Sequence, residues 1–86
     1  MKKAIIVFRS KTQVFEFMQT LAFYGVKAVI TSAPKEAKIG CSLAAETSFE
    51  NVYSVKKALS EGNYEGFVGI FAAEKNGGRT SVYRVS

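Results

Sequence analysis

Apolar residues follow different periods along the chain, and these periods predict alternating strands and helices. Residues 4–8 form a continuous apolar run that contains Ile and Val, which predicts a buried strand. The apolar positions that follow recur at helical spacing, at Val14, Phe17, Met18 and Leu21. Ser10 and Gln13 match a capping box at the start of this helix, and Gly25 lies where a C-terminal glycine would end it.

The middle of the chain predicts two further strands joined by a loop. Residues 26–31 are rich in Val and Ile, which favours a second strand. Residues 32–40 contain the chain's single proline, Pro34, and are expected to form a loop. Residues 41–46, CSLAAE, predict a third strand, although Ala is a poor strand former.

The last third of the chain predicts a helix followed by a hairpin. Residues 47–50 match a second capping box, and Gly62 is placed to end the helix. Its apolar stripe consists of Val52, Val55 and Leu59. Residues 67–73 predict a strand, 76–78 carry the turn signal Asn-Gly-Gly, and the alternating residues 80–85 predict an edge strand.

The predicted order of elements is β-α-β-β-α-β with one added strand. This order is typical of an α+β, ferredoxin-like sandwich, here expected as a single domain over residues 1–86 with an additional C-terminal strand. Right-handed crossovers would put the first and third strands in the centre of the sheet.

Composition removes several kinds of chemistry. The 86 residues include no His and one Cys, and all seven acidic residues are Glu. The chain therefore lacks the residues for His-assisted nucleophilic catalysis, for an ordinary zinc site and for an internal disulfide, so we expect no metal and no resident cofactor. The net charge of +5 comes from scattered lysines and arginines, which indicates solubility more than a dedicated nucleic-acid surface.

The predicted topology brings the single thiol, Cys41, to the end of the sheet where the first helix begins. Positive charge and unpaired backbone N–H groups at a helix N-terminus favour a thiolate or a bound anion. The candidate residues around the thiol are Arg9, Ser10, Lys11, Thr12, Lys35, Lys38, Gly40 and Ser42. The structural alternative is that Cys41 is a small buried hydrophobe, Ser10 only a helix cap, and the lysines solvated loop residues.

The stretch around Cys41 resembles the putative selenium/sulfur carrier protein-like family. Pro34-Lys35-Glu36, Cys41 and Leu43-Ala44 are similar to the family's Pro-Arg-Glu…Cys-Gly-Leu-Ala pattern, with Ser42 in place of the glycine. Residues 7–10 and 21–26 are similar to further family segments, so the resemblance covers roughly residues 3–62, and the hairpin of residues 75–86 is additional. The resemblance implies that Cys41 carries sulfur or selenium as a persulfide or selenide adduct.

Three functions are therefore compared. The first is a sulfur or selenium carrier, or thiol-dependent accessory protein, that uses Cys41 and a donor or acceptor protein as partner. The second is a regulatory or small-anion-binding module in which Cys41 is only structural. The third, nucleic-acid binding, is disfavoured because residues 41–46 contain neither an aromatic nor a basic side chain. Whether the chain is an enzyme stays open.

Location and assembly are further expectations. The apolar run after Met1 is too short for a signal peptide and no segment is long enough to span a membrane, so we expect a cytoplasmic protein without membrane contact. Residues 4–8 and 67–72 are apolar at nearly every position, whereas a sheet with one open face should alternate. We therefore expect a homodimer, or a higher homo-oligomer, through the sheet face. The alternative is that the fifth strand and C-terminal tail cover part of that face.

Overall fold

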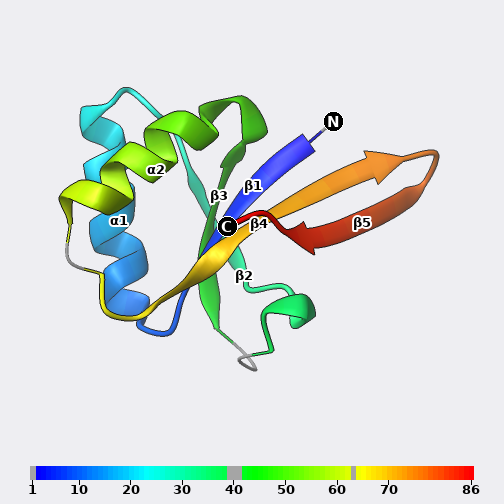
Figure 1. Cartoon of the computed structure of the whole chain (residues 1–86), viewed down its shortest axis with the longest axis horizontal. Coiled ribbons are helices and arrows are strands. Elements are labelled where there is room, and N and C mark those ends of the chain that lie inside the picture. Colours follow the sequence, from blue (N-terminus) through cyan, green and yellow to red (C-terminus); the bar gives the residue numbers. More distant parts are fainter. Residues whose placement is uncertain (1, 39–41, 63) are drawn as a thin grey trace.

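The computed structural model describes residues 2–38, 42–62 and 64–86. Five strands form one sheet in the order β2-β3-β1-β4-β5, with each neighbouring pair antiparallel, and two helices accompany it (Figure 1). This confirms the α+β class. The elements are β1 (Lys2–Phe8), α1 (Lys11–Phe23), β2 (Val29–Ser32), η1 (Lys35–Ala37), β3 (Leu43–Ser48), η2 (Phe49–Asn51), α2 (Val52–Glu61), β4 (Phe67–Asn76) and β5 (Arg79–Arg84), where η marks a single 3₁₀ turn.

Strand β1 is the central strand, and its apolar run is buried on both faces of the sheet. It pairs with β3 on one side and with β4 on the other. Ile6 and Phe8 belong to the core under the helices, whereas Ile5 and Val7 belong to a second cluster on the opposite face. Successive side chains of a strand point to opposite faces, so a strand covered on both sides is apolar at each position.

The larger core lies between the sheet and the two helices. Val14, Phe17 and Leu21 come from α1, and Val55 and Ala58 come from α2. These side chains meet the sheet residues Ala4, Ile6, Phe8, Ala45 and Ile70. The helical spacing that predicted both helices therefore does mark the faces that they bury.

The opposite face of the sheet is covered by segments of the same chain. Its cluster consists of Ile5, Val7, Ala44 and Phe71. Ala37 of η1 and Val82 of β5 pack against this cluster, together with Ala33, Val68 and Ala73. The apolar run that led us to expect a second chain on this face is thus buried within the same chain: β5 packs there as the alternative expects, and η1 packs there in addition. Homodimerisation through the face stays a prediction.

Helix α1 ends as the sequence predicts, but the connection after it is longer. Gly25 has a φ of +72°, and the Gly25 and Val26 N–H groups donate to the carbonyls of Ala22 and Leu21 at 3.0 and 3.1 Å. This is the Schellman motif, in which the residue after the glycine packs back on the helix. Val26 is buried in the main core for this reason, and β2 starts at Val29 instead of residue 26.

The second predicted capping box is wrong. Strand β3 begins at Leu43 and runs to Ser48, two residues later than predicted at each end. Thr47 is therefore a strand residue, and its Oγ1 donates to the Lys27 carbonyl at 2.8 Å and accepts from Asn51 Nδ2 at 3.0 Å. No side chain caps η2 or α2, and a 3₁₀ turn leads into α2 at Val52.

Strands β4 and β5 form the predicted hairpin, with β5 at the edge of the sheet. Gly77 and Gly78 both have positive φ, of +54° and +83°, as a two-residue turn between twisted strands requires. The turn end of this hairpin extends away from the helices (Figure 1). After β5 the chain returns to β4, where the Val85 N–H donates to the Ile70 carbonyl at 2.8 Å.

Candidate functional site at the start of the first helix

The first turn of α1 is basic and exposed to solvent. Ser10 is the N-cap, with its Oγ accepting from the Gln13 N–H at 3.4 Å. Lys11 and Thr12 are exposed in the first turn, which contains no acidic residue, and Arg9 is exposed just before it. A helix N-terminus already carries partial positive charge, and these side chains do not oppose it.

Only half of the predicted capping box forms here. The Gln13 side chain does not return to Ser10: its Oε1 accepts from the Gly66 N–H at 2.8 Å. The Gly66 carbonyl accepts from the Arg9 N–H at 2.7 Å, so both backbone groups of Gly66 are held. A Cβ at Gly66 would lie 2.8 Å from Gln13 Oε1, so a side chain there would push the Gln13 amide out of this position. Gln13 therefore connects α1 to the turn before β4.

Ser42 lies beside the end of β1. Its Oγ donates to the Phe8 carbonyl at 3.2 Å, and its own carbonyl accepts from the Ala33 N–H at 2.8 Å. Phe8 is the residue before Arg9, so the beginning of β3 and the start of α1 meet at this end of the sheet. Gly40 and Cys41, the other candidates of this segment, lie outside the described residues.

Lys35 and Lys38 come from the opposite face of the sheet. Both are exposed, at the two ends of η1, and Lys38 has a φ of +57°. Ala37 of η1 packs on the cluster of Ile5 and Val7, whereas α1 packs on the other face. The candidate residues therefore form two groups: Arg9 to Thr12 with Ser42, and the two lysines of η1.

An aromatic cluster packs against this end of the sheet, on the face that the two helices cover. The ring of Phe8 lies 5.2 Å from that of Phe17, 5.4 Å from that of Tyr64 and 5.8 Å from that of Phe67. Tilted and edge-on arrangements at such distances are favourable for aromatic pairs. Tyr64, which lies in the turn before β4, therefore packs against the last residue of β1.

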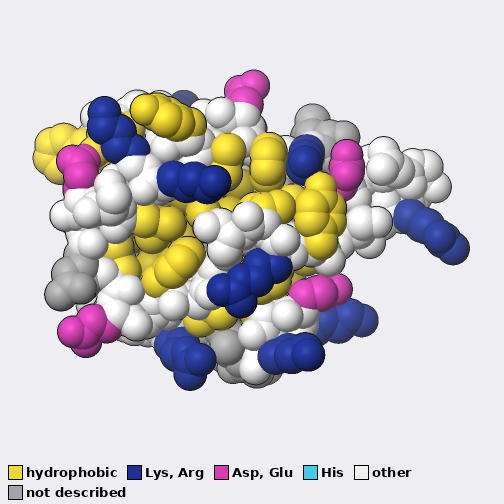
Figure 2. All heavy atoms as spheres, in the orientation of Figure 1, with side chains coloured by type: hydrophobic (Ala, Val, Ile, Leu, Met, Phe, Trp, Pro, Cys, Tyr) yellow, Lys and Arg dark blue, Asp and Glu magenta, His cyan; other side chains and the backbone are white. Residues whose placement is uncertain are grey.

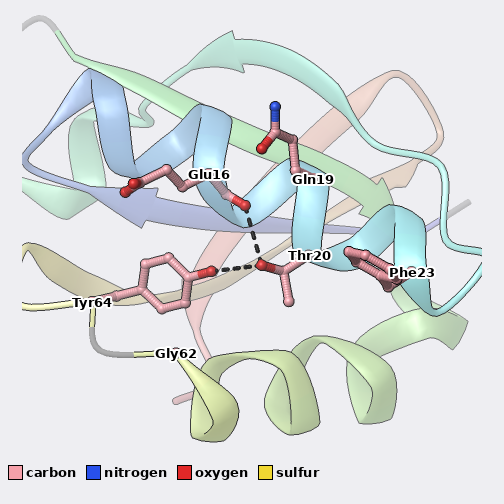
Figure 3. A pocket seen from close by; sticks show the side chains of 6 residues that line it. All are labelled: Glu16, Gln19, Thr20, Phe23, Gly62 and Tyr64. Carbon is pink, nitrogen blue, oxygen red and sulfur yellow. Dashed lines mark hydrogen bonds between the residues drawn. The ribbon is translucent and has the colours of Figure 1, made fainter.

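A second feature, which the sequence did not reveal, is an open groove of about 390 Å³ beside α1. Figure 3 shows Thr20 at its centre, with the hydroxyl 2.9 Å from that of Tyr64 and 3.2 Å from the Glu16 carbonyl. The groove is lined by Glu16, Gln19, Thr20, Phe23, Gly62 and Tyr64. Thr20 and Tyr64 are 44 residues apart, and no local pattern links them.

Three properties of the described residues concern metal binding, surface charge and membrane crossing. No three of their Cys, Asp or Glu side chains come together in a group that could hold a metal ion. On the face seen in Figure 2, Lys and Arg side chains are spread over several parts of the surface with acidic residues between them. Neither helix has the length and apolar character needed to cross a membrane, as far as the structure describes the chain.

Comparison with known proteins gives one match. The model of the family described as "Putative Se/S carrier protein-like" matches residues 3–67. No curated protein and no solved structure matches the chain. The matched range runs five residues beyond the resemblance expected from the sequence, and it ends at the first residue of β4. It covers the greater part of the chain, including Cys41 and the start of α1, and the chain therefore belongs to the putative Se/S carrier protein-like family.

Proposed function

We propose that this protein carries sulfur or selenium on Cys41. Membership of the family supports this proposal, and Cys41 is the chain's only cysteine. The observation that carries it structurally is the position of Ser42, whose Oγ donates to the Phe8 carbonyl next to Arg9. The residue after the thiol thus lies beside the basic first turn of α1, an environment that favours a thiolate.

The cargo step is a thiol–persulfide exchange. The Cys41 thiolate attacks the outer sulfur of a donor persulfide, R–S–SH, and the S–S bond of the donor breaks as a new S–S bond forms on Cys41. The donor leaves as the thiolate R–S⁻, and the transferred sulfur keeps its proton, so that Cys41 becomes Cys–S–SH. Because one S–S bond replaces another, no external oxidant or reductant is needed. A donor protein and an acceptor protein are the implied partners.

The fold assignment belongs to the same proposal. The first four strands lie in the order β2-β3-β1-β4, with α1 and α2 on one face. This order supports the ferredoxin-like class predicted from the sequence, extended by β5. In that class, the end of β1 and the beginning of β3 lie together, as the contact of Ser42 with Phe8 requires.

The test measures how fast iodoacetamide labels Cys41 in the folded protein across pH. A carrier thiol reaches half of its maximal labelling rate below about pH 8.5, the usual value for a free cysteine. The unfolded protein in denaturant is the matched control. Incubation with a small-molecule persulfide should then add the mass of one sulfur atom, and this addition should vanish in Cys41→Ser. Slow labelling with a midpoint at or above the unfolded value contradicts the proposal.

A second candidate is a small-anion-binding module in which Cys41 is only structural. The observation that favours it is the first turn of α1, which exposes Lys11 and Thr12 and has no acidic residue. Phosphate or carboxylate binding there would raise the melting temperature of the protein. A rise that persists in Cys41→Ala and is lost in Lys11→Glu would favour this function over the carrier.

A further inference from the structure

The two edges of the sheet differ in their charge. Strand β5 forms one edge and has an arginine at each end, Arg79 and Arg84. Arg84 is held in place, because its Nη2 donates to the Val68 carbonyl at 2.8 Å and its Nε to the Ser86 carbonyl at 3.1 Å. Charged side chains on an edge strand oppose pairing with another chain. The β5 edge is protected in this way.

The other edge, β2, has no such protection. Its four residues Val29–Ser32 contain no charge and no proline, and the uncharged stretch continues over residues 28–34. The Val29 side chain is 58% exposed and that of Ile30 is 38% exposed. In the register with β3, these two residues lie opposite Glu46 and Ala45, so they project on opposite faces of the sheet margin. An edge of this kind is a template for one more strand.

We propose that β2 pairs antiparallel with β2 of a second copy of this chain, so that the sheet continues across a two-fold axis. The partner strand must be short and uncharged and must offer an apolar side chain on each face, and β2 itself does so with Val29 and Ile30. A two-fold axis makes such a contact self-complementary, because each copy offers the other the same surface. The proposal concerns assembly and does not depend on the chemistry of Cys41.

Charge favours the antiparallel arrangement. Lys27 stands two residues before β2, and the chain as a whole carries +5. A parallel pair would place the two copies of Lys27 side by side. An antiparallel pair centred between residues 30 and 31 places Lys27 opposite residue 34 of the other copy, so the two lysines are separated by roughly 24 Å at 3.4 Å per residue, which is beyond the screening length at physiological salt.

The edge is a better interface than the face of the sheet. On the face of the sheet opposite the helices, which we call the open face, Ile5 and Phe71 are already buried against η1 and β5 of the same chain. At the β2 edge, in contrast, apolar side chains remain exposed. A four-residue strand buries much less area than a stable dimer needs. We therefore expect weak association, with a dissociation constant on the order of 100 µM to 1 mM. This constant should decrease as salt is added, because salt screens the repulsion between the two positively charged copies.

The test follows the sedimentation coefficient from about 20 µM to about 2 mM, which brackets this range. The background is Cys41→Ser, so that no native thiol links two chains. We expect the coefficient to rise with concentration, and Ile30→Lys to abolish the rise. The matched control is Tyr83→Lys on the β5 edge, where the side chain is 40% exposed and close to Ile30 in exposure. This control should keep the association.

Three results would overturn the proposal: a monomer at all concentrations, a dimer that persists in Ile30→Lys, or equal loss in both variants. If Ile30→Lys fails to fold, Val29→Lys replaces it, because Val29 is the more exposed residue. Single cysteines at residues 29, 30 and 31 provide an independent measurement. Under mild oxidation, at least one of them should form a disulfide-linked dimer, and a cysteine at Thr80 should not.

Discussion

The two faces of the sheet are buried by different means. Under α1 and α2, Phe8, Phe17, Tyr64 and Phe67 form an aromatic cluster, and α1 is also held by the hydrogen bond from the Gly66 N–H to Gln13. The other face has a smaller cluster, covered by the single turn η1 and by β5. A short 3₁₀ turn and an edge strand are thinner covers than two helices. The comparison shows that full burial of β1 does not imply equally strong packing on its two sides.

The family match adds a second difference between the faces. The matched residues 3–67 include α1, α2 and η1, but they end before Val82, which packs on the open face. The helix-covered face is thus built almost entirely from the matched part of the chain. The cover of the open face draws on the added hairpin, which also lengthens the sheet to five strands.

Two adjacent residues of β1 give the sharpest test of this comparison. Ile6 is fully buried under the helices, and Ile5 lies on the open face. We expect Ile6→Ala to lower the free energy of unfolding by about 4 kcal/mol and Ile5→Ala by about 2 kcal/mol, because the thinner cover can collapse into the cavity. Urea denaturation measures both values. Equal losses would show that the two faces are packed equally well.

The polar connection on the helix side gives the next largest effect. Gln13→Ala removes the acceptor of the Gly66 N–H, and we expect a loss of about 1.5 kcal/mol. The Gly66 amide should also exchange with solvent faster than in the parent protein. Gln19→Ala, at an exposed site on the same helix, is the control and should leave both values unchanged. Unchanged exchange at Gly66 in Gln13→Ala would mean that this bond contributes little.

On the open face, Val82 tests whether the hairpin stabilises the rest of the fold. Val82→Ala removes two methyl groups from a partly buried contact, and we expect a loss of about 1 kcal/mol in the free energy of unfolding. Ser81→Ala, at an exposed neighbour, should cause no measurable change. If both variants are as stable as the parent, β5 is an appendage and the open face depends on η1 alone.

The smallest expected effect comes from the cap of α1. Ser10→Ala should cost about 0.5 kcal/mol, at the low end for N-caps, because the Ser10 Oγ to Gln13 N distance of 3.4 Å is long. Ser10→Asp should restore the loss, since aspartate caps equally well and its charge suits the helix N-terminus. A loss above about 2 kcal/mol would mean that Ser10 does more than cap the helix.

Local patterns predicted the elements well where the interactions are local. The helical stripe of α1, its end at Gly25 and the Asn-Gly-Gly turn all depend on residues within one or two turns of each other. The start of β2 was predicted too early because Val26 is a good strand residue by composition. Its backbone, however, completes the end of α1 by donating to the Leu21 carbonyl.

Hydrogen bonds between distant residues account for what the sequence did not predict. Gln13 has the spacing of a capping residue, but its partner is Gly66, which lies 53 residues away. Thr47 likewise looks like a cap, and instead bonds to the Lys27 carbonyl from within β3. Local spacing shows that a side chain has a suitable donor or acceptor, and the fold decides which partner it meets.

At the candidate site, the predicted topology accounts for the position of Ser42 beside Phe8. It does not account for the separation of Lys35 and Lys38 from α1.

The central position of β1 has a consequence for folding. Its partners are β3 and β4, so residues 4–8 pair with residues that are synthesised later, as late as residue 72. Until those strands exist, a five-residue apolar run is without its neighbours, and such runs are prone to aggregate. Lys2 and Lys3 precede the run and Arg9 follows it. Charges in these positions discourage aggregation, so the flanking cations protect the nascent chain during the interval in which its centre is incomplete.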